Sequence, residues 1–292
     1  MTRQEFAELV AQDILVLDGA TGSNMIKAGM PRGFCSEDWI LENPQPLIDL
    51  QRSYVEAGSQ IVYAPTFSCN RIGLGNFGLA DRMADMNREL VALSKEAVGG
   101  RALIAGDLTT TGQMMAPRGP MTYEKLLDVY KRHVTCLLDA GVDLLGAETM
   151  LSVEETMAFV DAATSLCDLP IMCTLTLQAD GTALYGGDAI EAVVTLQEMG
   201  ASAVGLNCSV GPDQLEAVIR SMAEVATVPV IAKPNAGMPT ITETGEAVYS
   251  MNAVDFGRSM KMLVDAGARI VGGCCGTDAE YIREVCKNVK NH

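Results

Sequence analysis

Residues 265–277 read Asp-Ala-Gly-Ala-Arg-Ile-Val-Gly-Gly-Cys-Cys-Gly-Thr, and this stretch contains the unit from which the fold is built. An amphipathic segment ends in a glycine, where a left-handed residue can close a helix, and an apolar run follows at once. The same phrase of a small or flexible residue plus glycine precedes three other apolar runs, at 56–58, 139–141 and 198–200. Because a helix that ends in glycine feeds a buried strand, we expect strands and helices to alternate along the chain.

Eight apolar runs with the length of buried strands are spaced along the sequence. They lie near residues 14–18, 60–66, 102–108, 143–149, 170–177, 203–209, 229–235 and 270–276. Helical patterns separate them, for example at 47–57, 122–140, 188–199 and 253–266. Eight strands alternating with helices in 292 residues predict an α/β protein with the (β/α)8 TIM-barrel fold. No linker or low-complexity tract divides residues 1–292, so we expect a single domain.

The composition limits the classes of partner. Lys and Arg number 21 against 37 Asp and Glu, which gives a formal net charge of −16. No basic run is present to neutralise phosphates, so the chain is not expected to bind nucleic acid or an anionic membrane surface. The polar start at 1–8 does not resemble an export signal, and no run approaches the length of a membrane span. With its cysteines expected to be reduced, the protein is predicted to be cytoplasmic.

Polar side chains stand where the predicted strands end, and in a barrel of this type chemistry gathers at the carboxyl ends of the strands. Asp, Thr and Asn are also common as helix caps and in turns, so position alone leaves both a capping and a catalytic role open for them. The residues at these ends are Asp18, Thr66, Asp107, Glu148, Cys208, Asn235, Cys274 and Cys275.

The nine cysteines divide into two groups. Cys208, Cys274 and Cys275 end two apolar runs, and glycines beside the adjacent pair allow the strand to break so that both thiols turn toward one point. A disulfide between neighbours would be strained, an odd total fits no secreted framework, and the spacing lacks the close pairs of a zinc finger. We therefore expect a thiolate cluster assembled from distant strands. An isolated cysteine is usually a small core residue, which we expect of Cys35, Cys69, Cys136, Cys167, Cys173 and Cys286.

Val-Gly-Gly-Cys-Cys-Gly-Thr at 271–277, together with Gly-Leu-Asn-Cys at 205–208, resembles the zinc site of the cobalamin-type homocysteine S-methyltransferases. The resemblance implies that Cys208, Cys274 and Cys275 bind Zn²⁺ and form the catalytic metal site, with homocysteine as substrate. It extends over nearly the whole chain through further landmarks at 17–22, 39–44, 66–71, 146–150 and 234–237.

The resemblance also assigns a substrate pocket. The loop after the first strand would hold the amino-acid end of homocysteine, and its Gly-Ala-Thr-Gly turn leaves backbone N–H groups free for a carboxylate. Glu148 would pair with the substrate ammonium, while Asp18 and Asn235 would line the pocket near the metal. The chain departs from the family pattern at Tyr63 and Pro65, where many relatives carry Glu and Asn, and at 107–112, which replaces a loop containing Gly-Pro. The full set of expected substrate-binding residues is Asp18, Gly19, Ala20, Thr21, Ser68, Glu148 and Asn235.

Charge counting indicates what such a site would do. Zn²⁺ with three thiolates carries a formal charge of about −1, and a catalytic zinc site keeps one tetrahedral position open. A substrate thiol entering that position would lose its proton, because coordination lowers its pKa below the usual value of about 8.5. Metal-hydroxide hydrolysis is not expected, since the only histidines are His133, which we place at the surface or between helices, and His292.

The methyl donor is expected to be a separate molecule. A corrinoid-binding Asp-x-His-x-x-Gly motif is absent, because Lys131 stands two positions before His133 and His292 is the last residue. The likeness to cobalamin-dependent methionine synthase favours a separate corrinoid protein that carries methylcobalamin, with methionine as product. S-methylmethionine or betaine is the alternative donor within the same superfamily.

Two interpretations from other classes stay open. The three cysteines could hold a structural zinc in a non-catalytic barrel, in which case a fourth protein ligand should fill the open position. Alternatively, Cys274 and Cys275 could form a redox-sensing thiol pair without metal.

Overall fold

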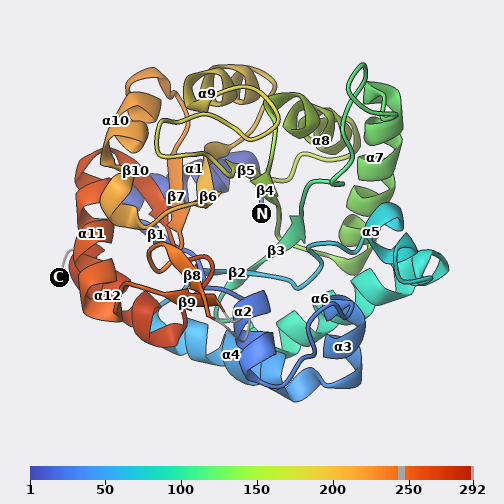
Figure 1. Cartoon of the computed structure of the whole chain (residues 1–292), viewed down its shortest axis with the longest axis horizontal. Helices are drawn as coiled ribbons and strands as arrows, with labels where there is room; N and C mark the ends of the chain where they lie inside the picture. Colours follow the sequence, from blue (N-terminus) through green and yellow to red (C-terminus); the bar gives the residue numbers. More distant parts are fainter. Residues whose placement is uncertain (243–246, 291–292) are drawn as a thin grey trace.

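Eight parallel strands form a ring in the computed structural model, which describes residues 1–242 and 247–290 (Figure 1). Their order around the ring is β1, β10, β7, β6, β5, β4, β3, β2, and every hydrogen-bonded pair is parallel. Among the described residues no ladder joins β1 to β2, but the Gln60 N–H donates to the Val16 carbonyl at 2.8 Å, so the ring is nearly closed. The strands are β1 (Leu15–Val16), β2 (Ile61–Tyr63), β3 (Leu103–Leu108), β4 (Leu144–Met150), β5 (Ile171–Leu175), β6 (Ala203–Cys208), β7 (Val230–Pro234) and β10 (Ala268–Val271).

Helices cover the outer side of the ring (Figure 1). The long helices follow the strands in turn and are α4 (Pro44–Ala57), α6 (Met83–Val98), α7 (Tyr123–Ala140), α8 (Val153–Leu166), α9 (Ala189–Glu198), α10 (Glu216–Val225), α11 (Ala253–Asp265) and α12 (Ala279–Val289). The remaining helical segments are α1 (Arg3–Gln12), α2 (Gly22–Lys27), α3 (Ser36–Glu42), α5 (Arg71–Gly75) and the 3₁₀ turns η1 (Ala80–Arg82) and η2 (Pro212–Gln214). Among the described residues, no helix combines the length and the apolar character that a membrane crossing requires.

Helix α7 shows how the sequence sets these boundaries. The side chain of Thr122 accepts a hydrogen bond from the Lys125 N–H and caps the start of the helix. Gly141 ends it with a left-handed φ of 73°, as the glycine phrase predicts. His133 lies on the buried face, with Nε2 3.0 Å from Oδ1 of Asn87 on α6, so its predicted place between helices is confirmed and a surface position is wrong.

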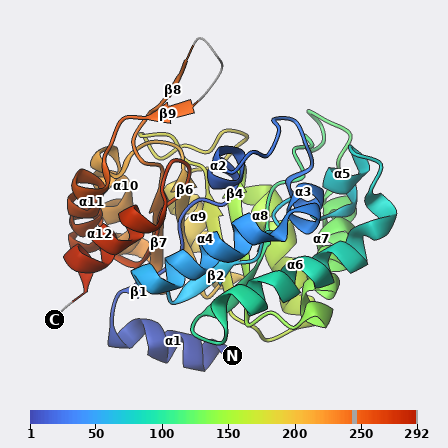
Figure 2. The ribbon, with the colours of Figure 1, turned by 90° about the horizontal axis from the view of Figure 1, so that it is seen from below.

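The core lies partly inside the ring and partly between the ring and the helices. Inward side chains such as Leu144, Met172 and Ile231 fill the barrel, and Phe6 and Val10 of α1 pack into the same cluster. Figure 2 shows α1 lying across the amino-terminal end of the barrel. Because α1 closes that end, access to the interior comes from the carboxyl ends of the strands. The cysteines expected in the core divide into buried Cys35, Cys69 and Cys173 and half-buried Cys136, Cys167 and Cys286.

The eighth barrel strand is shorter than predicted, and one hairpin was not predicted at all. β10 ends at Val271, so the two adjacent cysteines follow the strand instead of belonging to it. After β7 the chain forms an antiparallel hairpin of β8 (Pro239–Ile241) and β9 (Ala247–Tyr249), which projects beyond the carboxyl-end face (Figure 2). Its side chains are mostly exposed, so the sequence has no alternation between buried and exposed positions that would reveal it.

Candidate active site

Cys208, Cys274 and Cys275 meet at the carboxyl end of the barrel. Cys208 ends β6, and the adjacent pair follows β10, two strands away in the ring. The three sulfur atoms lie within 4.8 Å of one another, and the described residues contain no second group of three metal-ligating side chains this close together. Sγ of Cys208 is 2.8 Å from that of Cys274 and 3.8 Å from that of Cys275, and all three thiols are free. The predicted cluster is therefore present.

The donor set of this cluster fits zinc. A Zn–S bond of about 2.3 Å places two sulfurs of a tetrahedral site about 3.8 Å apart. The sulfurs of Cys208 and Cys275 already have this separation of 3.8 Å, while the 2.8 Å between Cys208 and Cys274 would have to widen. Three cysteines also leave one tetrahedral position for a further ligand, as in catalytic zinc sites.

The backbone around the cysteines is specialised for this convergence. Cys208 and Ser209 adopt left-handed φ angles of 57° and 71°, which are uncommon for residues other than glycine. Gly272 and Gly273 approach neighbouring chain so closely that an added Cβ would lie 2.8 Å from the Asp18 carbonyl oxygen and 2.4 Å from a Thr277 side-chain oxygen, respectively. Glycine is required at both positions for the adjacent cysteines to turn toward Cys208.

The three thiols share their protons unequally. Hydrogen bonds from Cys208 and Cys274 lower the pKa of Cys275 to about 3. Hydrogen bonding to Cys274 and Cys275, together with burial, raises the pKa of Cys208 well above its usual value. For Cys274, the lowering by Cys208 is outweighed by the bond to Cys275 and by burial, so its pKa rises to about 11. The cluster concentrates negative charge at Cys275, and a bound cation would displace the remaining thiol protons.

A cavity of about 290 Å³ opens beside the cysteines and suits a small metabolite. Its walls come from the loop after β1, from residues after β2 and from the ends of β3, β4, β6 and β7. The expected site residues that line it are Asp18, Gly19, Ala20, Thr21, Glu148, Cys208, Cys274 and Cys275.

A buried lysine joins the predicted acidic residues in this cavity. Lys233 Nζ lies 3.2 Å from Oε2 of Glu148 and 3.5 Å from Oδ1 of Asp18. The same ammonium group stands 4.9 Å from the centre of the Tyr63 ring, within range of a cation–π contact. The backbone N–H of Tyr63 donates to Oδ2 of Asp18 at 2.8 Å. Tyr63, one of the positions where the chain departs from the family pattern, therefore contacts both Lys233 and Asp18.

Asp107 adds a third carboxylate to the same wall. Thr66 fixes its backbone, because the Thr66 hydroxyl donates to the Asp107 carbonyl at 2.9 Å and accepts from its N–H at 3.1 Å. Oδ1 of Asp107 is buried and has no hydrogen-bond partner among the described residues. Burial raises the pKa of Asp107 well above its usual value, and the nearby charge of Glu148 adds to this. For Asp18, burial outweighs the lowering by Lys233 and raises the pKa to about 7.

Two expected substrate residues lie outside the cavity lining. The Asn235 amide donates to the Ser209 carbonyl at 3.1 Å, and its Oδ1 is buried without a partner among the described residues. The backbone N–H of Ser68 donates to Oε1 of Glu37 at 2.7 Å, and it is Glu37 that lines the cavity. Asn235 and Ser68 therefore lie next to residues of the site but do not line the cavity.

Sequence reasoning did not identify three further residues at the site: Lys233, Glu37 and Asn207. Lys233 gave a signal, because it is a charged residue inside the buried run that forms β7. Glu37 gave none, since an acidic residue in the first turn of a helix is ordinary. Asn207 forms two hydrogen bonds with Thr149, accepting from its N–H at 2.7 Å and donating to its hydroxyl at 2.8 Å.

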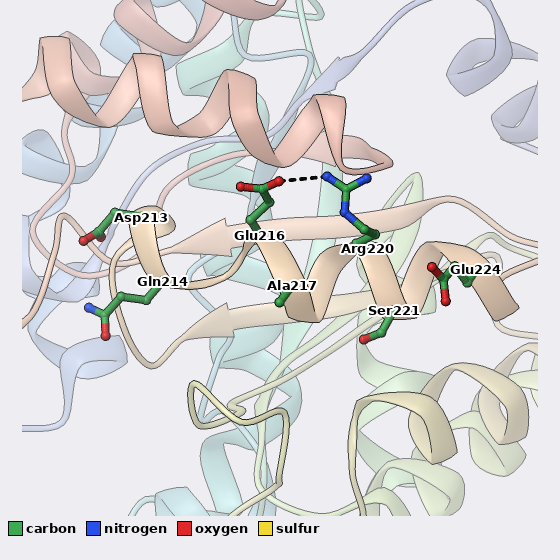
Figure 3. A pocket seen from close by; sticks show the side chains of 7 residues that line it. All are labelled: Asp213, Gln214, Glu216, Ala217, Arg220, Ser221 and Glu224. Carbon is green, nitrogen blue, oxygen red and sulfur yellow. Dashed lines mark hydrogen bonds and ion pairs between the residues drawn. The ribbon is translucent and has the colours of Figure 1, made fainter.

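A second hollow, of about 450 Å³, lies on the outer face of the barrel along α10 (Figure 3). The ion pair between Arg220 and Glu216, 2.7 Å apart, bridges two turns of the helix there. The lining of this hollow contains no cysteine or histidine and is mostly exposed. The smaller cavity beside the three cysteines is therefore the candidate active site.

The family model described as homocysteine S-methyltransferase matches residues 15–289. The chain belongs to the homocysteine S-methyltransferase family. It is an enzyme of that family, and its three-cysteine cluster is consistent with the zinc site expected there, while membership leaves the methyl donor open.

Two curated relatives of this homocysteine S-methyltransferase family member are the methionine synthases of Mycobacterium leprae and Mycobacterium tuberculosis. They are 28% identical over 309 and 305 residues, respectively. Each alignment covers 98% of this chain but 25% of the relative. The chain therefore spans about a quarter of the length of the methionine synthases it matches.

Solved structures of the homocysteine methyltransferase MmuM from Escherichia coli share the fold. The metallated form superposes with a TM-score of 0.81 at 23% identity, over 96% of this chain and 97% of that one. The oxidised form gives 0.80 at 22% identity, over 97% and 98%. At these identities the likeness shows the fold alone, which confirms the predicted single-domain TIM barrel.

Proposed function

We propose that this chain methylates homocysteine to methionine, with Cys208, Cys274 and Cys275 holding the zinc ion that activates the substrate thiol. The observation that carries this proposal is the convergence of three free thiols, within 4.8 Å of one another, on the lining of a cavity of metabolite size. When bound, zinc would supply an open coordination position that lowers the pKa of a thiol, so that the substrate sulfur is deprotonated near neutral pH.

The residues of the chain would place the substrate against this centre. The turn at 19–22 lines the cavity and is suited to the substrate carboxylate, although the N–H of Ala20 already donates to the Thr277 hydroxyl at 3.2 Å. The acidic wall of Asp18, Asp107 and Glu148 would receive the ammonium group. With both ends of the amino acid held, the sulfur is directed toward the cysteines, and orientation of this kind lowers the barrier to transfer.

The transfer itself is a displacement at carbon. The substrate thiol releases its proton to solvent, and the sulfur lone pair forms the new S–CH₃ bond. The bond between the methyl group and the donor breaks at the same time, and its electron pair leaves with the donor. The barrel therefore has to admit the donor at the carboxyl-end face, with the methyl carbon in line with the sulfur.

We infer a separate methyl-corrinoid protein as the donor. The support is the likeness to two methionine synthases over 98% of the chain. A corrinoid donor would leave as cob(I)alamin. Small onium donors such as S-methylmethionine or betaine are the alternative that the test has to separate.

The test is to incubate the zinc-loaded protein with homocysteine and one donor at a time, and to measure methionine. Methylcobalamin, free or on a corrinoid protein, is expected to give methionine, and the variant C208S should give none. Rapid methionine formation with S-methylmethionine or betaine, and none with any methyl-corrinoid, would replace the proposed donor and keep the acceptor. No methionine with any donor, and no binding of homocysteine, would refute the function and favour a structural zinc or a redox thiol pair.

A further inference from the structure

Three carboxylates and one ammonium group face each other inside the cavity. Asp18, Asp107 and Glu148 are nearly fully buried, and Lys233 is the cation among them. With all four groups ionised the set would carry a formal charge of −2, which is costly to bury. Protonation of a carboxyl group or entry of a further positive group would relieve this cost.

Lys233 forms ion pairs with two of the three carboxylates, although Oδ1 of Asp18, like Oδ1 of Asp107, accepts no hydrogen bond from the described residues. Its Nζ lies 3.2 Å from Glu148 and 3.5 Å from Asp18, and Asp18 also accepts the Tyr63 N–H at 2.8 Å. The face of the Tyr63 ring gives the lysine a third attractive contact. A substrate ammonium placed on Glu148 would stand beside this lysine, so two like charges would share one carboxylate.

Asp107 is the carboxylate left without a partner. Its Oδ1 is buried and accepts no hydrogen bond from any described residue, and no ion pair within 4.0 Å involves it there. The residue lines the cavity, and Thr66 holds its backbone from both the N–H and the carbonyl. A buried, unpaired acceptor on a rigid strand is suited to a ligand that donates hydrogen bonds and carries positive charge.

In the register of β3 and β4, Asp107 lies opposite Gly146, which has no side chain. An added Cβ at Gly146 would come within 2.5 Å of the Tyr63 ring, so the ring occupies the space that a side chain there would need. The Asp107 carboxylate thus has no side chain from the paired position of β4 beside it.

We propose that Asp107 binds the ammonium group of the amino-acid thiol, and that Lys233 acts as a positioning residue that neutralises Glu148 and Asp18. This inference rests on the proposed function, because it takes an amino-acid thiol as the acceptor. It moves the ammonium contact from β4, where the family resemblance puts it, to β3. The substrate class is therefore an α-amino acid with a terminal thiol, and an otherwise equal thiol without the amino group should bind weakly.

Calorimetry with two thiols tests this assignment. Homocysteine and 4-mercaptobutyrate have the same thiol, carboxylate and chain length, but only homocysteine has the ammonium group. The zinc-loaded wild type is expected to bind homocysteine about 10- to 100-fold more tightly, as for one charge-assisted hydrogen bond. The variant D107N should bind both thiols equally, with its affinity for 4-mercaptobutyrate unchanged. E148Q is the comparison variant: it removes a charge from the same wall but also leaves Lys233 with Asp18 alone, so its stability is measured first, and it should keep the preference for homocysteine.

The outcomes separate this inference from the proposed function. A preference for homocysteine that survives in D107N and disappears in E148Q would overturn the assignment of Asp107. If D107N does not fold, a crystal structure of the wild type with homocysteine decides: the ammonium nitrogen must lie within hydrogen-bond distance of Asp107, and contact with Glu148 alone would contradict the inference. Failure of the wild type to bind either thiol would count against the proposed function instead.

Discussion

The ammonium nitrogen of Lys233 lies 3.2 Å from a carboxylate oxygen of Glu148, and the side chains come from β7 and β4, with β6 and β5 between them in the ring. Both side chains are almost completely buried, at 3% and 12% exposure. The pair therefore connects non-adjacent strands inside the barrel, where water cannot compensate for the loss of either charge.

Removal of this lysine should destabilise the protein strongly. The variant K233M leaves Glu148 and Asp18 buried without a cation, and breaking a buried pair from one side costs about 3 to 5 kcal/mol. R220M is the surface control, because Arg220 and Glu216 are about half exposed and such pairs contribute about 0 to 1 kcal/mol. Urea unfolding of both variants measures the difference. Equal losses in the two variants would mean that the buried network has no special role in stability.

Each cysteine of the cluster should be needed for metal. We expect C208S, C274S and C275S to lose most of their zinc, because a neutral hydroxyl is a much poorer ligand than a thiolate. Their far-UV circular dichroism should stay barrel-like, since the apolar core of the ring does not depend on the metal. C167S is the control, as Cys167 is half-buried and lies at the end of α8, away from the cluster. Zinc content by mass spectrometry that is full in all three single variants would refute the ligand set.

Stability should fall in mild acid because of His133. Burial lowers the pKa of His133 from 6.5 to about 3. Between these two pH values the histidine is protonated in the unfolded state but neutral in the folded state. This contribution to stability is complete above pH 6.5 and is lost progressively as the pH falls from 6.5 toward 3. At pH 5 the loss amounts to about 2 kcal/mol.

The variant H133Q isolates this contribution to stability. Glutamine keeps an amide N–H for Asn87 Oδ1, the partner of His133 at 3.0 Å, but it does not titrate. Urea unfolding between pH 7 and pH 5 should therefore show a smaller loss in H133Q than in the wild type. H292Q removes the other histidine of the chain and should retain the wild-type dependence. An identical pH dependence in H133Q and the wild type would contradict the assignment.

Asn207 should stabilise the end of β4. Thr149 has a left-handed φ of 58°, an unfavourable angle for a β-branched residue, and its two hydrogen bonds with the Asn207 side chain hold it there. N207A is expected to lower the free energy of unfolding by about 2 kcal/mol and to weaken homocysteine binding, because Glu148 precedes Thr149. T149G should lose less, since glycine tolerates this φ and keeps its N–H for Asn207. Urea unfolding and calorimetric titration with homocysteine measure the two effects. An N207A variant with unchanged stability and unchanged homocysteine affinity would exclude this role.

The barrel could be predicted because its signals are local. Glycines mark the ends of helices, and apolar runs mark buried strands. Each β/α unit can therefore be recognised from a short stretch of sequence. The hairpin of β8 and β9 has no such signal, because its strands are three residues long and exposed. The end of β10 at Val271 was also missed, since the apolar run continues into glycines that leave the strand.

The site could be predicted in part. Cys208, Cys274 and Cys275 combine an unusual residue type with glycines that permit convergence, and the geometry brings them together. The pairing of Lys233 with Glu148 and Asp18 could not be foreseen, because it depends on which inward positions of non-adjacent strands share a level of the barrel. The lack of a partner for Asp107 is likewise a property of three-dimensional packing, not of its neighbours in sequence.

Zinc-edge X-ray absorption, recorded before and after addition of homocysteine, shows whether the substrate thiol binds the zinc ion. We expect three sulfur ligands and one lighter ligand in the zinc-loaded protein, because Cys208, Cys274 and Cys275 are the three thiols that converge. Homocysteine should replace the lighter ligand and give four sulfurs at about 2.3 Å. A spectrum that does not change on saturation with homocysteine would show that the substrate thiol never reaches the metal, and would contradict the proposed role of zinc.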